Sequence, residues 1–361
     1  MTTESETIEQ APGPPDMPDE RVRRVGGFAR LMTRPEIGAI AALVVVWVFF
    51  AIVAWDNNFV SMAATASILN RAAPLGILAV AVALLMIAGE FDLSIGSLIG
   101  FAGIALMLMV TPGSQGGFGL ALGPAIVIAL AITLVAGFFN GILVVTTKLP
   151  SFIITLGGLF IFRGLATAAA RIRTSRTQLG GFTDIPGYET LNALLGQKIG
   201  IFGANFDIAI LWWVGLTALA TWVMLRTKVG NWIYGVGGDP NASRNVGVPV
   251  NGLKISLFVL TAFAAFLVAL TQVTQFGGAD SLRGEQQEFN AIIAAVVGGV
   301  LLTGGYGSVV GAAVGALIFA LVQQGITITG VDADWFKVFV GAILVLAVIF
   351  NNYIRQRAQK R

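Results

Sequence analysis

Residues 93–147 read LSIGSLIGFAGIALMLMVTPGSQGGFGLALGPAIVIALAITLVAGFFNGILVVTT, and this stretch contains no Asp, Glu, Lys or Arg. An α-helix rises about 1.5 Å per residue, so roughly 20 residues cross the hydrocarbon core of a bilayer. The stretch is long enough for two crossings, and the Gly- and Pro-rich segment 111–119 supplies a turn between them. This pattern predicts a chain that spans a membrane as α-helices.

The rest of the chain has the same character. Of its 361 residues, 56% are hydrophobic and only 11% are charged, against about 25% charged residues in a soluble protein. The absence of Cys and His excludes disulfides, a Ser-His-Asp triad and the usual zinc ligands. The formal net charge of +3 is too small to indicate nucleic-acid binding. We therefore expect no enzyme, no catalytic or metal-binding residues, no cofactor on this chain and no nucleic-acid partner.

Apolar runs separated by polar or Gly/Pro breaks predict an all-α, polytopic membrane protein with about ten transmembrane helices. The runs are 37–55, 72–88, 93–110, 125–145, 152–169, 206–225, 255–273, 291–302, 309–322 and 336–350, of which the eighth is short for a full crossing. The expected organisation has three parts. They are a disordered acidic, Pro-rich and then basic tail at 1–36, a transmembrane domain at 37–353, and a basic C-terminus at 354–361.

The distribution of Lys and Arg predicts the orientation of these spans. With ten spans both termini share one side of the membrane. That side carries fourteen Lys and Arg residues, whereas the opposite side carries seven. Because cytoplasmic segments are enriched in Lys and Arg, we expect both termini in the cytoplasm and the long polar interval 171–205 outside.

Charged residues in or beside the apolar runs are the first candidates for function. Gly89-Glu90-Phe91-Asp92 separates the second run from the third, and carboxylates at membrane depth usually face protein or water. Asp92 either caps the following helix or belongs to a pathway or gate. Arg163, inside the fifth run, either pairs with Glu90, Asp92 or backbone carbonyls or reaches the external interface. Polar residues of neighbouring runs are candidates for the same pathway: Ser94, Asn140 and Thr155.

A second polar group precedes the short eighth run. It contains Glu285, Glu288 and Asn290, with Gln275, Gln286 and Gln287 close by. An external mouth lined by amides and carboxylates suits a hydroxyl-rich solute, and an ordinary solvated loop is the alternative. Glu288 and Asn290 are the pathway candidates in this group.

The predicted cytoplasmic loop 226–251 contains signals for a short helix. Asp239 is a good N-cap, Pro240 suits the first helical position, and Gly247 suits the position after the C-cap. Such a helix could fit a groove in a partner, or the segment could be a plain connector. The candidate coupling residues are Gly238, Asp239, Pro240, Asn241, Ala242, Arg244 and Gly247.

Four motifs in order along the chain resemble the permease subunits of ABC importers for monosaccharides, the ribose/xylose/arabinose/fructose group. They are 89–97, 149–157 with Arg163-Gly164, 237–248, and 288–307. Three positions depart from the family pattern: Glu90 stands in place of a Gly, Asp239 in place of an Asn, and Asn290 in place of a common Asp. These departures affect the transfer of a particular substrate and not the class.

The resemblance implies a function and partners. It implies a multi-pass permease of the bacterial inner membrane that imports a simple sugar such as ribose, xylose or fructose. A cytoplasmic ATPase would dock on the 240–248 helix and hold the ATP and Mg²⁺, an external binding protein would deliver the sugar, and a second permease subunit would complete a dimer. The alternatives are an ABC permease for a nucleoside, polyol or signalling sugar, an ion-coupled secondary transporter, and a structural membrane anchor.

Overall fold

A computed structural model describes residues 35–332, 334–342, 345–346 and 349. The predicted terminal segments lie outside this part, except for residues 35 and 36. Within these described residues, seven α-helices are long and apolar enough to cross a membrane. They are α2 (Pro35–Val53), α3 (Met62–Ile87), α5 (Leu122–Thr147), α6 (Ser151–Thr174), α8 (Ala209–Arg226), α11 (Val250–Phe276) and α13 (Val309–Ile328).

Two shorter apolar helices also correspond to predicted spans: α4 (Ile95–Val110) and α12 (Gln287–Val297). Each of these nine helices overlaps one of the first nine predicted runs, although α3 begins well before its run at 72–88 and α12 ends before the end of its run at 291–302. The tenth run, 336–350, includes residues outside the described part. The predicted fold class, an all-α polytopic membrane protein, is confirmed.

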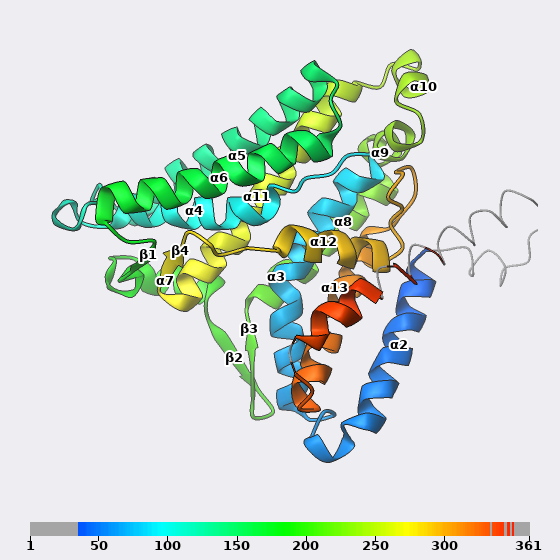
Figure 1. Ribbon diagram of the computed structural model, residues 1–361, viewed down its shortest axis with the longest axis horizontal. Helices are drawn as coiled ribbons and strands as arrows, with labels where there is room; N and C mark the ends of the chain where they lie inside the picture. Colours follow the sequence, from blue (N-terminus) through cyan, green and yellow to red (C-terminus); the bar gives the residue numbers. More distant parts are fainter. Residues whose placement is uncertain (1–34, 333, 343–344, 347–348, 350–361) are drawn as a thin grey trace, which may run out of the picture. The chain divides into compact units, whose positions relative to one another are not determined.

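The helices differ in how much of their surface other helices cover. In α3 and α13, 78% of the apolar window is buried, whereas in α2 only 17% is buried. Figure 1 shows α3 and α13 running together with α2 beside them, and α4, α5, α6 and α11 packed as a second set. A helix that is apolar all round but covered on all sides is a core helix, so α3 and α13 are central and α2 presents its apolar side chains outward.

Close backbone approaches hold α12 against α13. A Cβ atom added to Gly315 of α13 would overlap the carbonyl oxygen of Ala294 in α12, and one added to Gly311 would overlap that of Gly298. Small residues spaced by four allow such approaches between membrane helices. Gly96 and Gly100 of α4 have the same spacing and lie against the segment 281–288.

The interval 171–205, expected only as a polar loop, contains short regular elements. They are β1 (Gln178–Gly180), η4 (Phe182–Asp184), α7 (Tyr188–Leu195), β2 (Lys198–Ile201) and the start of β3 (Ala204–Asp207). β2 and β3 form an antiparallel hairpin, and β1 pairs antiparallel with β4 (Gly278–Asp280). The β1–β4 pair joins residues about 100 positions apart, and single-sequence patterns carry no signal for such a pairing. Short 3₁₀ turns η2 (Trp55–Asn57) and η3 (Gly113–Gln115) lie in other connections.

The loop predicted at 226–251 is largely helical. α9 (Lys228–Gly238) precedes the short α10 (Pro240–Asn245). The sequence predicted a loop before Asp239, because a Gly-rich segment has a low intrinsic helix propensity. That prediction was wrong, since residues 228–238 form α9. Its buried positions Gly230, Ile233 and Val236 share one helix face, so tertiary packing stabilises it.

Candidate functional site

Asp92, in the break between α3 and α4, is fully buried. One carboxylate oxygen accepts hydrogen bonds from the Ser94 backbone N–H (2.9 Å) and hydroxyl (2.6 Å). The other oxygen accepts a bond from the Thr261 hydroxyl of α11 (2.6 Å). Ser94 itself is the residue preceding α4. The carboxylate thus binds the N-cap residue of α4, Ser94, and links this end of α4 to α11.

The hydrogen-bond network around Asp92 extends to α5. The Asn140 amide of α5 donates to the Ser94 hydroxyl (2.8 Å), and both side chains are buried. The structure therefore brings together three residues that the sequence proposed separately: Asp92, Ser94 and Asn140. Thr261 was missed, because it lies within a long apolar run with no local feature that distinguishes it.

The backbone of the break is held by hydroxyls of α6. The Ser151 hydroxyl accepts a bond from Phe91 N–H (3.0 Å), and the Thr155 hydroxyl accepts one from Leu93 N–H (3.0 Å). Ser151 and Thr155 are four residues apart and share one face of the helix. That spacing, at the beginning of an apolar run, is a sequence signal that could have found Ser151 beside the predicted Thr155. Phe91 itself is half-buried at the break.

Glu90 forms an ion pair with Lys254 near the start of α11. Both side chains are mostly buried, at 11% and 17% exposed. Lys254 is one of the fourteen Lys and Arg residues counted above for the cytoplasmic side, and its sequence context gave no sign of this partner. The pair instead connects the break to α11 across 164 positions of sequence.

The suggestion that Arg163 pairs with Glu90 or Asp92 was wrong. A nitrogen of its guanidinium lies 3.7 Å from a carboxylate oxygen of Glu285, which stands just before α12. The carboxylates at the break are already engaged by Lys254, Ser94 and Thr261. Arg163 therefore belongs to a second polar cluster.

This second cluster lies against the first turn of α4. The Glu288 side chain of α12 is 2% exposed, and a Cβ atom on Gly96 would overlap its carboxylate. Two nitrogens of Arg163 and one oxygen of Glu288 are buried with no hydrogen-bond partner in the described structure. We call Arg163, Glu285 and Glu288 the arginine cluster. Asn290, predicted with them, is half-buried one turn into α12.

The predicted short helix at Asp239 is confirmed as α10. The Asp239 carboxylate accepts bonds from Asn241 N–H (2.8 Å) and Ala242 N–H (3.0 Å), and Pro240 occupies the start of the helix. Gly247 follows the C-cap with a φ of +84°, which favours glycine. The helix presents exposed residues: Asn241, Ala242, Arg244 and Asn245.

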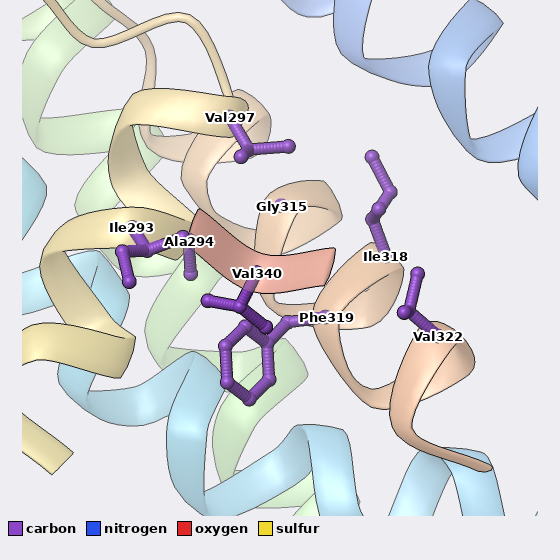
Figure 2. A pocket seen from close by; sticks show the side chains of 8 residues that line it. All are labelled: Ile293, Ala294, Val297, Gly315, Ile318, Phe319, Val322 and Val340. Carbon is purple, nitrogen blue, oxygen red and sulfur yellow. The ribbon is translucent and has the colours of Figure 1, made fainter. Parts of the chain in front are cut away.

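An apolar hollow between α12 and α13 has a different character from these polar groups. Figure 2 shows its lining of aliphatic and aromatic side chains, among them Ile293, Ile318, Phe319 and Val340. The labelled lining offers no side-chain donor or acceptor to a hydroxyl-rich solute. The polar groups around α4 are therefore the better candidate for a translocation site.

Comparison with known proteins matches residues 64–348 to the family described as branched-chain amino acid transport system / permease component. The chain is 28% identical over 330 residues to the fructose import permease protein FrcC of Rhizobium meliloti, covering 91% of this chain and 88% of that protein. It is 28% identical over 387 residues to the xylose transport system permease protein XylH of Escherichia coli (92% and 96% covered). It is 30% identical over 330 residues to the ribose import permease protein RbsC of the same organism (90% and 96% covered). No solved structure matches the chain significantly.

These similarities confirm the resemblance to sugar permeases that the four motifs indicated. They also confirm a multi-pass protein of a bacterial inner membrane with a transport role. The family model covers most of the chain, from the first turn of α3 to beyond α13. The chain belongs to the family of branched-chain amino acid transport system permease components.

Proposed function

We propose that this chain is the permease subunit of an ABC importer that moves a monosaccharide into the cell, driven by ATP hydrolysis on a partner ATPase. The observation that carries the proposal is the match to fructose, xylose and ribose permeases over about nine tenths of the chain. In this proposal both termini are cytoplasmic. An external binding protein delivers the sugar, and a second permease subunit completes the path.

The arginine cluster supports a hydroxyl-rich substrate. Buried polar groups without partners are costly, at about 1–3 kcal/mol each, so they usually bind water or a ligand. The orphan nitrogens of Arg163 donate hydrogen bonds, and the orphan oxygen of Glu288 accepts one. A sugar hydroxyl both donates and accepts, so it could satisfy both groups during passage. We place a polar step of the sugar path here, between α6, α12 and the first turn of α4.

Replacing Arg163 by leucine is expected to lower sugar uptake about tenfold, because one charged hydrogen bond contributes about 1.5–3 kcal/mol. The measurement is initial uptake per folded permease in vesicles. Arg171→Leu is the matched control, since Arg171 lies on the same helix but is exposed. Equal uptake by both variants would contradict a role for Arg163 in the path.

Helix α10 is the proposed docking site for the ATPase. It is exposed, capped at both ends and thus held as a formed unit, as a contact that transmits force requires. Arg244 projects from it and is oriented by a hydrogen bond to the Asn241 side chain (3.2 Å).

Arg244→Glu is expected to weaken ATPase binding at least about tenfold, because charge reversal places a like charge against a site that accepts arginine. The measurement is co-purification of the ATPase with the membrane-inserted permease. Arg226→Glu is the control, since Arg226 is also an exposed arginine, at the end of α8. Undiminished co-purification with Arg244→Glu would contradict docking at α10.

The function itself is tested by uptake into vesicles that contain the permease and the ATPase, with ATP on the ATPase side and the binding protein on the other. Fructose, xylose and ribose are the first solutes, followed by nucleosides, polyols and a signalling sugar. We expect uptake of a monosaccharide that stops without ATP. Uptake that persists without the ATPase and follows a proton or sodium gradient would establish a secondary transporter instead. Absence of flux for every solute would favour a membrane anchor.

A further inference from the structure

Three backbone segments from distant parts of the chain meet at one point. They are the end of α3 (87–89), the end of α9 (237–238) and the segment 304–307 between α12 and α13. The Gly305 N–H donates a hydrogen bond to the Ile87 carbonyl (2.8 Å). A Cβ atom on Gly237 would overlap that same carbonyl and lie 2.5 Å from the Gly305 nitrogen. We call the meeting point the glycine junction.

The contacts of the glycine junction are between backbones, with no side chain in between. A Cβ atom on Gly304 would lie 2.8 Å from the Gly89 Cα and 3.1 Å from the Gly237 carbonyl oxygen. Gly304 and Gly305 have φ values of +76° and +74°, in the left-handed region that favours glycine. Such contacts are stiff, because no rotamer change can absorb a displacement of one segment relative to another.

One side chain adds a second connection one turn earlier in α9. The Tyr234 hydroxyl donates a hydrogen bond to the Gly307 carbonyl (2.9 Å). Gly307 immediately precedes Ser308, which caps the N-terminus of α13 through a bond to Gly311 N–H (3.2 Å). The bond therefore joins α9 to the beginning of α13.

The segments that leave the junction lead to the functional groups already described. Asp239, the N-cap of α10, follows Gly238 directly. Glu90 and Asp92 follow Gly89 on the way to α4. These backbone contacts therefore connect α10 to the break before α4 and to the segment 304–307 before α13, which we call the second break.

We infer that Gly237 and Tyr234 are positioning residues that transmit movement of α10 to both helix breaks at once. The inference rests on the proposed function, because it needs an ATPase that moves α10. A purely structural role, close packing of α9 on α3, predicts that changes here alter stability alone. A transmitting role predicts a different result for the variants: the ATPase still binds them and hydrolyses ATP, but the two breaks no longer change when nucleotide binds to the ATPase.

The test uses the full permease with its ATPase. The chain has no cysteine, so Phe91→Cys supplies a single reporter at the first break. Its maleimide labelling is measured with and without a non-hydrolysable ATP analogue. Gly237→Ala is compared with Gly252→Ala, a helical glycine whose added Cβ meets nothing within 4 Å. ATPase co-purification and ATP hydrolysis are measured on each variant.

We expect the analogue to change the labelling rate several-fold in the reporter alone and with Gly252→Ala, and to leave it unchanged with Gly237→Ala. In the chain without the reporter, Gly237→Ala is expected to lower uptake per ATP hydrolysed about tenfold, because its Cβ would push the Ile87 carbonyl away from the Gly305 N–H. Tyr234→Phe, which creates no overlap, is expected to lower it about fivefold by loss of one hydrogen bond. This second variant covers the case in which Gly237→Ala fails to fold.

Equal responses of Gly237→Ala and Gly252→Ala to the analogue would overturn the inference. So would a full response and full uptake per ATP in Tyr234→Phe. If the unchanged chain binds the ATPase and the reporter responds, but no sugar moves, the proposed function fails while the junction stands. If the ATPase does not bind the unchanged chain, both fail.

Discussion

Replacing Asp92 by alanine is expected to abolish transport and to lower the stability of the folded permease by a few kcal/mol. The carboxylate is fully buried and accepts bonds from the Ser94 N–H, the Ser94 hydroxyl and the Thr261 hydroxyl. Each buried donor left without an acceptor costs about 1–3 kcal/mol. Loss of the carboxylate also removes the Thr261 hydrogen bond that fixes the start of α4 to α11, so the first turn of α4 is held less firmly beside the arginine cluster.

Asp92→Asn is the informative comparison, because the amide oxygen can still accept from Ser94. We expect this variant to recover most of the stability and part of the transport. The measurements are uptake per folded molecule and the midpoint of thermal unfolding in detergent. If each folded Asp92→Ala molecule transports as much sugar as the wild type, Asp92 has no role in the path. Its role would then be limited to capping the helix.

Replacing Lys254 by alanine is expected to destabilise the permease by an amount near the lower end of about 3–5 kcal/mol. Breaking a buried ion pair leaves the remaining charge without compensation, and Glu90 is only 11% exposed. Partial solvent access to both side chains screens the effect, which is why the lower end applies. The measurement is the thermal unfolding midpoint of the purified, membrane-inserted protein.

The double variant Glu90→Gln, Lys254→Met separates the cost of a lone buried charge from the value of the pair. Removing both charges leaves no unpaired buried charge, and an ion pair contributes little to the free energy of unfolding compared with uncharged side chains of similar size. We therefore expect the double variant to regain most of the lost stability. If it is as unstable as Lys254→Ala, the pair is not the reason for the loss.

Local sequence patterns predicted the elements that depend on interactions between residues close together in the chain. The length of an apolar run determines whether a helix can cross a bilayer, so nine helices lie where the composition placed them. A capping residue acts on N–H groups two or three positions away. For this reason α10 was found from Asp239, Pro240 and Gly247 alone.

Local patterns failed for α9 and for the paired strands β1 and β4. The glycine-rich sequence of α9 does not favour a helix by itself, and its helical state depends on burying Ile233 and Val236 against neighbouring elements. The strand pair depends on bringing Gln178 opposite Asp280. Neither condition is visible in a window of ten or twenty residues.

The sequence by itself determined that this chain spans a membrane, roughly where its apolar helices lie and that its four motifs resemble sugar permeases. It also singled out Glu90, Asp92 and Arg163 as charges in need of partners. Only the tertiary structure decided the partners: Lys254 for Glu90, Thr261 for Asp92 and Glu285 for Arg163. The physical reason is range. A hydrophobic run acts through its own length, whereas an ion pair or hydrogen bond requires two atoms a few ångströms apart, and here those atoms belong to residues more than a hundred positions apart.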